Sequence, residues 1–207
     1  MLKDSEIGSI AAIGPVADPP HSKYERLIAF AKQVPPATTV VAHPCDETSL
    51  RGAVEAAHLG IITPILVGPA AKISAVAQKH GIEIARYEIV DAPHSDAAAA
   101  KAVALIHEGK GELLMKGSLH TDELMREVTS SKTGLRTARR ISHVFIMDVP
   151  THADTLFITD AAGIVLGARV PIILTSRADS VRSRMASCAM AVLYAHARRS
   201  TAPVPAA

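Results

Sequence analysis

The chain has 207 residues, enough for one large hydrophobic core or two small domains. Its 22 Lys and Arg residues nearly balance 20 Asp and Glu residues, which argues against a general nucleic-acid-binding protein. Hydrophobic residues make up 48% of the chain but aromatic residues only 3%, so the core must consist of Ala, Val, Ile and Leu, as in the buried parallel strands of α/β proteins.

Several other classes of protein are not expected either. No stretch reaches the roughly 20 apolar residues that span a bilayer, and the first residues lack the apolar run and flanks of a signal peptide. Cys45 and Cys188 stand in unrelated contexts, which argues against a disulfide framework. The ten His residues are scattered and form no HExxH motif, and the chain has no CxxC pair of cysteines, so neither common metal-binding motif is present. We therefore expect a cytoplasmic protein with no metal site and no membrane or nucleic-acid partner.

The first two thirds of the chain alternate strands and helices. Residues 1–21 are expected to form a flexible lead-in. The expected elements are then a helix over 24–33, strands over 38–42, 62–67, 87–90 and 113–115, and helices over 46–59, 69–80, 96–108 and 122–130. Asp46 is expected to cap the second helix, and Gly60 and Gly81 to end the helices before them. Short aliphatic strands that alternate with helices are typical of parallel βαβ units.

The alternation stops after residue 141. Four strand-like runs follow with no helix between them, over residues 144–147, 156–159, 164–166 and 172–174. Consecutive strands of this kind would have to pair as hairpins. A long Ala-rich helix over 178–199 and a frayed tail over 201–207 complete the chain.

The most specific stretch for function is PIILTSRADS, residues 171–180, where an aliphatic strand runs into the last helix. Ligands of open α/β sheets bind beyond the carboxyl ends of the strands, where helix N-termini attract anions. Thr175, Ser176 and Arg177 are therefore candidates for a phosphate or oxyanion site. The alternative is that Ser176 and Asp179 only cap the helix and that Arg177 is a solvated residue of its first turn.

Two further strand ends carry polar residues. In LLMKGS, residues 113–118, Gly117 would let the backbone approach a ligand and Lys116 would supply a positive charge, although a Lys-Gly turn is ordinary. In VAHPCD, residues 41–46, His43 could face a ligand or simply pack in the core, and Cys45 before a helix could have a lowered pKa. Arg126, on the following helix, could hold a ligand or face solvent. Arg136, Arg139 and Arg140 could contact a nucleotide phosphate or interact with the negative end of a helix.

These stretches together resemble the phosphate acetyltransferases and phosphate butyryltransferases, including the acetyltransferase module fused to hydratase-like partners. The segments that carry the resemblance are VVAHPCDETSLRGAVEAAHLGIITPILVG, LLMKGSLHTDELMREV, GLRTARRISHVFIMDVP with LFITDAA, and GARVPIILTSRADS. Together they extend from about residue 23 to residue 199.

The resemblance implies an enzyme that moves a short acyl group between coenzyme A and phosphate, with coenzyme A as a substrate, no bound cofactor and a dimeric assembly. Ser176 and Arg177 would hold phosphate or the carbonyl oxygen, and Arg126 would bind phosphate or coenzyme A. Lys116, Gly117, Ser118 and Thr175 would contribute to substrate binding. Acetyl-type members place an aspartate base seven residues after the signature serine. Ser183 stands at that position here, so Asp179 becomes the candidate base.

The resemblance also implies a fold and a missing part. The family has two α/β domains, the second inserted into the first, with the active site between them. Here DAAG, residues 160–163, joins two segments that a long α/β stretch separates in the family. We therefore expect a parallel-sheet, Rossmann-like three-layer domain formed by residues 22–140 and 168–200, with residues 141–167 as the remnant of a truncated second domain.

Three hypotheses about function follow. The chain could be an acyltransferase of this family. Loss of most of the second domain would remove one wall of the cleft between the domains, and this would weaken substrate positioning and the exclusion of water. It could instead be a non-catalytic remnant that binds coenzyme A or an anion, or associates through its former interdomain face. It could also be an unrelated domain that binds a sugar phosphate or nucleotide phosphate.

Overall fold

The computed structural model describes residues 22–139, 141–147, 156–159, 163–175 and 179–201. The lead-in and tail predicted from the sequence lie outside these ranges, apart from Thr201. The elements are α1 (Ser22–Ala31), β1 (Ala37–Ala42), α2 (Glu47–His58), β2 (Ile62–Gly68), α3 (Ala70–His80), β3 (Glu88–Asp91), α4 (Ser95–His107), β4 (Leu113–Lys116), α5 (Thr121–Thr129), β5 (Ser142–Met147), β6 (Leu156–Thr159), β7 (Gly163–Leu166), β8 (Ile172–Leu174) and α6 (Val181–Thr201). The predicted alternation of strands and helices is confirmed.

The helix ends follow local signals in the sequence. Asp46 caps α2, because its Oδ1 accepts a hydrogen bond from the Ser49 amide at 2.7 Å. Gly81 ends α3 with a φ of +60°, the left-handed conformation that glycine adopts without strain.

The last helix begins at Val181, slightly later than predicted. The Ser180 hydroxyl accepts a hydrogen bond from the Ser183 amide at 3.1 Å, so Ser180 takes the capping role that the sequence had suggested for Ser176 and Asp179.

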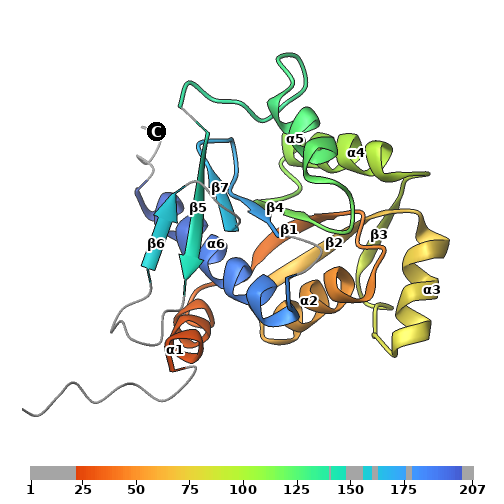
Figure 1. Cartoon of the computed structure of the whole chain (residues 1–207), viewed down its shortest axis with the longest axis horizontal. Helices are drawn as coiled ribbons and strands as arrows, with labels where there is room; N and C mark the ends of the chain where they lie inside the picture. Colours follow the sequence, from red (N-terminus) through yellow and green to blue (C-terminus); the bar gives the residue numbers. More distant parts are fainter. Residues whose placement is uncertain (1–21, 140, 148–155, 160–162, 176–178, 202–207) are drawn as a thin grey trace, which may run out of the picture.

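The described strands form one eight-stranded sheet in the order β3-β2-β1-β4-β8-β7-β5-β6. The first five strands of that order are parallel, as expected for βαβ units. β1 lies between β2 and β4, and β4 lies between β1 and β8 (Figure 1). The strands that lead to His43, Gly117 and Thr175 are therefore neighbours.

The helix-free strands pair with one another at one end of the same sheet. β7 pairs antiparallel with β8, and β5 pairs antiparallel with both β7 and β6. The hairpin pairing expected of consecutive strands is confirmed for β5 with β6 and for β7 with β8, whereas β7 pairs with β5 and is not a neighbour of β6 in the described sheet. These strands continue the parallel sheet, so in the described part of the chain they share a sheet with the α/β domain.

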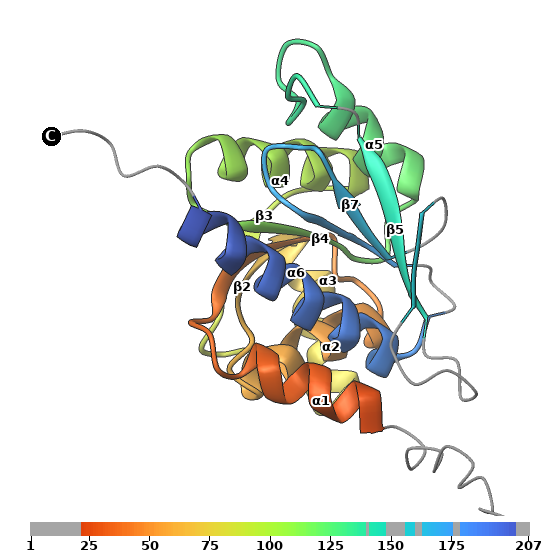
Figure 2. The same cartoon turned by 90° about the vertical axis from the view of Figure 1, so that its left-hand side faces the viewer.

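Helices cover the parallel part of the sheet in two layers. α1, α2, α3 and α6 bury their apolar residues in one cluster, and α4 and α5 bury theirs in another. Figure 1 shows α4 and α5 on one side of the sheet and α2 with α6 on the other, and Figure 2 shows α1 running beside α6. The α/β, three-layer fold predicted from the sequence is confirmed.

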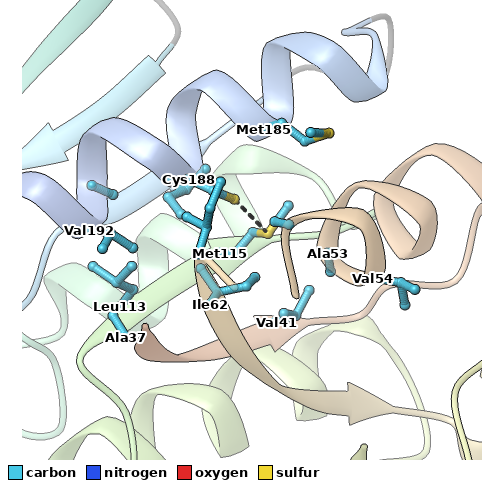
Figure 3. Close-up of a cluster of buried hydrophobic side chains, with 14 of the residues drawn as sticks. Ala37, Val41, Ala53, Val54, Ile62, Leu113, Met115, Met185, Cys188 and Val192 are labelled. Atoms are coloured by element: carbon cyan, nitrogen blue, oxygen red, sulfur yellow. Dashed lines mark hydrogen bonds between the residues drawn. The ribbon is translucent and has the colours of Figure 1, made fainter. Parts of the chain in front are cut away.

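The core between α6 and the sheet is aliphatic and sulfur-containing. Leu113 and Met115 of β4 meet Cys188 and Val192 of α6 (Figure 3), and all four are fully buried. The Cys188 thiol lies 3.9 Å from the Met115 sulfur. Because α6 packs on the strand that ends in Lys116, this contact also fixes where the start of α6 lies relative to the strand ends.

The loop after β4 lies against the loop after β1 at unusually close range. The Gly117 amide donates to the Ala42 carbonyl oxygen, and the Ser118 amide donates to the His43 carbonyl oxygen, each at 2.8 Å. A Cβ atom on Gly117 would lie 2.4 Å from the His43 carbonyl oxygen and 2.5 Å from that of Ala42. Glycine is therefore required at position 117 for the two strand ends to meet.

Replacing Gly117 should test this close approach. We expect Gly117→Ala to lower the free energy of unfolding by about 3 kcal/mol, because the added methyl group would overlap backbone atoms that cannot move independently. Gly68→Ala, at the end of the adjacent strand β2, should cost much less, since its Cβ would meet nothing closer than 3.4 Å. Urea unfolding followed by circular dichroism measures both values, and equal losses would contradict the predicted contact.

Candidate active site

The ends of β1, β4 and β8 form two switch points of the sheet. β1 and β8 lead into α2 and α6 on one face, whereas β4 leads into α5 on the other. Ligands of open α/β sheets bind where adjacent strands send their following helices to opposite faces. The loops after β1, β4 and β8 are therefore the part of this fold best placed to bind a ligand.

A buried lysine joins the ends of β4 and β8. Lys116 is only 2% exposed, and its Nζ donates to the Thr175 carbonyl oxygen at 3.1 Å and to the Gly117 carbonyl oxygen at 3.4 Å. Lys116 was predicted as a charge in a turn, but it is the last residue of β4. Its ammonium group holds in place the residue that directly precedes Ser176 and Arg177.

A buried arginine converges on the same residue. Arg184, in the first turn of α6, is fully buried, and its Nη1 donates to Thr175 Oγ1 at 2.6 Å. Burial lowers the pKa of Arg184, and the carboxylates of Asp46 and Asp179 partly offset that effect. Two cationic side chains thus bind Thr175: Arg184 of α6 its hydroxyl, and Lys116 of β4 its carbonyl oxygen.

The role of Arg184 was not predicted from the sequence. Its side chain passes over Gly52 of α2, where an added Cβ would lie 3.0 Å from the arginine Cδ. The available signal was the glycine in the interior of α2, because a glycine inside a helix often has a packing reason.

The other predicted site residues differ in whether they are described and in whether they lie near Thr175. Ser176 and Arg177, together with Arg140, lie outside the described residues. Asp179 is half-buried just before α6, and its charge acts on Arg184. Arg126 is separate from this group: it lies exposed on α5 and pairs with Asp96 of α4 at 3.4 Å. Ser183, at the position of the family's aspartate, is exposed, with its hydroxyl 3.0 Å from that of Ser180.

Ser118 contacts the β1 loop through its side chain. Its Oγ lies 2.9 Å from the His43 carbonyl oxygen, 3.1 Å from His43 Nδ1 and 3.2 Å from the Cys45 amide nitrogen. These contacts use the hydrogen-bonding capacity of the hydroxyl within the protein. Ser118 therefore orients His43, and Gly117 lets the two loops meet.

The suggestion that Cys45 has a lowered pKa is wrong. The thiol is buried, and burial raises its pKa to about 11, although the nearby charge of Lys72 acts in the opposite direction. Burial likewise raises the pKa of Cys188 to about 12. Neither thiol is activated as a nucleophile at neutral pH.

The described residues contain no group of three or more His, Cys, Asp and Glu side chains placed to hold a metal ion. In the same ranges, no helix combines the length and apolar character that crossing a membrane requires.

Comparison with known proteins identifies the family. The chain is 45% identical to the phosphate acetyltransferase of Rhizobium meliloti, over 307 aligned positions that include 89% of this chain and 97% of that protein. It is 36% identical to the phosphate butyryltransferase of Clostridium beijerinckii over 139 residues, 67% of this chain and 46% of that protein. The chain belongs to the phosphate acetyl- and butyryltransferase family. The resemblance seen in the sequence is confirmed, and an unrelated sugar-phosphate or nucleotide-phosphate domain is ruled out.

The chain matches only part of the length of some of its relatives. The aligned region covers 39% of the phosphate acetyltransferase of Rickettsia prowazekii, to which it is 47% identical. Because the alignment to the Rhizobium protein has 307 positions and this chain has 207 residues, at least 100 positions of that relative have no counterpart here. The predicted shortening relative to the family is thereby supported. No protein-family model matches the sequence.

A solved structure agrees on the fold. The branched-chain phosphotransacylase of Enterococcus faecalis superimposes with a TM-score of 0.59, covering 76% of this chain and 99% of that one. The two sequences are only 14% identical in this superposition, so the match bears on the fold alone.

The cysteine pKa values predict low thiol reactivity in the folded protein. With a pKa of about 11, roughly one Cys45 side chain in a thousand is a thiolate at pH 8, so Ellman's reagent should react slowly. Both thiols should react fully in concentrated urea, and the native rate should still rise with pH above 9. Rapid labelling of one thiol per chain in native buffer at pH 8 would show that burial does not protect it. Cys45→Ser and Cys188→Ser variants would identify which one.

Proposed function

We propose that this protein transfers an acetyl or butyryl group between coenzyme A and phosphate, converting acyl-coenzyme A and phosphate into acyl phosphate and coenzyme A, and the reverse. Coenzyme A acts as a substrate, and no cofactor is required. The observation that carries the proposal is the convergence of Lys116 and Arg184 on Thr175 in a chain of this family. We further propose that it works as a dimer in the cytoplasm.

The two buried cations support this function in two ways. They fix Thr175, so the loop with Ser176 and Arg177 begins from a defined position. They also place positive charge under the strand ends, where the phosphoryl group of the substrate would bind. An anion bound there would be stabilised more strongly than at the surface, because a buried charge is less screened by water.

The residues of the signature loop would then perform the transfer. Ser176 and Arg177 would hold the phosphate or the carbonyl oxygen on which negative charge develops. Thr175 and Lys116 would shape the site from beneath, and Asp179 would be the candidate base next to Arg184. Arg126, exposed on α5, would contact a phosphate of coenzyme A farther from the reacting atoms.

A second function is favoured by one specific observation, the absence of at least 100 positions that the Rhizobium relative has. If those positions form half of the substrate site, this chain would be a remnant that binds coenzyme A or an anion with little turnover, or that associates through the exposed former interdomain face. Transfer has to outcompete hydrolysis, and that requires positioning and exclusion of water from both sides.

Turnover by the purified protein decides between the two. Release of the coenzyme A thiol is followed with acetyl- and butyryl-coenzyme A plus phosphate, for the wild type and for Ser176→Ala and Arg177→Ala. We expect each variant to lose about 100-fold or more in kcat, the usual cost of removing an oxyanion or phosphate donor. Ser74→Ala and Arg86→Ala, two exposed positions away from the strand ends, should leave the rate unchanged.

Two results would count against the acyltransferase function. Turnover that survives in both signature variants would place the chemistry elsewhere. Absence of turnover in a wild-type protein that circular dichroism shows to be folded would favour the remnant. Binding of coenzyme A would then be measured by calorimetry to decide whether that remnant retains a ligand site.

A further inference from the structure

His43 has an unusual backbone conformation at a switch point of the sheet. Its φ is +53°, and it is the non-glycine residue with positive φ in the described part of the chain. Such conformations are uncommon for residues with a side chain, and they concentrate at functional sites. The conformation places the imidazole between the loop after β1 and the loop after β4, with only 9% of the residue exposed.

The contacts of Ser118 determine which imidazole nitrogen carries hydrogen. The Ser118 Oγ accepts from the Cys45 amide at 3.2 Å and donates its own hydrogen to the His43 carbonyl oxygen at 2.9 Å. The remaining contact, 3.1 Å between Oγ and His43 Nδ1, then needs a hydrogen from the ring. Nδ1 is therefore the donor, and in the neutral ring Nε2 holds a free lone pair.

The surroundings of His43 keep the ring neutral. Burial is the largest effect and lowers the pKa of His43, and the ammonium group of Lys72 on α3 lowers it further. Glu123 of α5, Asp46 before α2 and a hydrogen bond to the residue's own backbone act in the opposite direction but do not reverse the shift. Because a histidine with a lowered pKa stays unprotonated at neutral pH, Nε2 can accept a proton there.

His43 also lies at a suitable distance from Thr175, the last described residue after β8. β1 and β8 flank β4, so their ends are about 10 Å apart, two strand spacings. An acyl phosphate and the coenzyme A thiol that attacks it can together bridge such a span. The consecutive residues Lys116, Gly117 and Ser118 connect the two sides, since Lys116 contacts Thr175 and Ser118 contacts His43.

We propose that His43, rather than Asp179, is the general base of the transfer, a role that rests on the proposed function. The charge of Asp179 acts instead on the buried Arg184. Nε2 accepts the proton of the coenzyme A thiol while the sulfur attacks the carbonyl carbon of the acyl phosphate. The S–H bond and the bond from the carbonyl carbon to the phosphate oxygen break, and the C–S bond forms. The imidazolium then returns the proton to the departing phosphate, which leaves as hydrogen phosphate. Ser118 is a positioning residue that sets the tautomer.

The variant His43→Asn tests this role without disturbing the backbone, because asparagine adopts positive φ readily. We expect kcat/KM for acyl phosphate and coenzyme A to fall about 100-fold, the usual contribution of a general base. Because burial lowers the pKa of His43, the wild-type rate should decline only at a pH below the usual range of histidine titration, and this decline should disappear in the variant. Circular dichroism confirms that both proteins are folded.

A matched histidine provides the control. His94 precedes α4, and its Nδ1 accepts a hydrogen bond from the Ala97 amide at 3.2 Å. Asparagine is a good helix cap, so His94→Asn should keep the fold, the rate and the pH profile of the wild type. Retention of both rate and pH profile in His43→Asn, while Ser176→Ala loses turnover, would overturn the role of His43 and leave the proposed function intact.

Nuclear magnetic resonance of the imidazole nitrogens gives a readout that does not need turnover. In the wild type His43 should show a protonated Nδ1 and an unprotonated Nε2, and Ser118→Ala should change this pattern. Coenzyme A should shift the Nε2 resonance more than desulfo-coenzyme A, which lacks the thiol. Equal shifts with the two compounds, or a protonated Nε2, would overturn the proposal even if the wild type has no activity.

Discussion

The close contact between the strand ends around β4 is the constraint on which the site depends. On one side Gly117 and Ser118 bind the loop after β1, and on the other Lys116 holds the loop after β8. Arg184 reaches the same place from α6, over a glycine of α2. Each contact buries a polar or charged group. The arrangement is therefore stable only while all its partners stay in position, which fixes the geometry of the loops that follow the strands.

This arrangement lies at the strand ends of one continuous sheet. The parallel strands, the two helix layers and α6 form a complete α/β unit, and β5, β6 and β7 extend its sheet antiparallel beyond β8. The strands that follow residue 141 without intervening helices are thereby paired within the sheet. The shortened chain thus retains a continuous core beneath the strand ends, which a ligand site on this side of the molecule requires.

The sequence was most informative where structure depends on near neighbours. Asp46 and Gly81 mark helix ends through contacts within a few residues, so those ends could be predicted. The environment of Lys116 could not, because its partner Thr175 lies far along the chain. Arg184 was missed for the same reason, since the space for its side chain comes from Gly52. The raised pKa of Cys45 also depends on burial, which its position before a helix does not reveal.

The most direct test of a substrate site at the ends of β1, β4 and β8 is to titrate the ¹⁵N-labelled protein with coenzyme A and follow its amide resonances. We expect shifts concentrated at the amides of His43, Gly117 and Thr175, at the carboxyl ends of the strands. The amides of Ala37 and Glu112, at the opposite ends of β1 and β4, should stay unchanged. Shifts confined to those opposite ends, or none at saturating coenzyme A, would show that the buried cations do not form a substrate site.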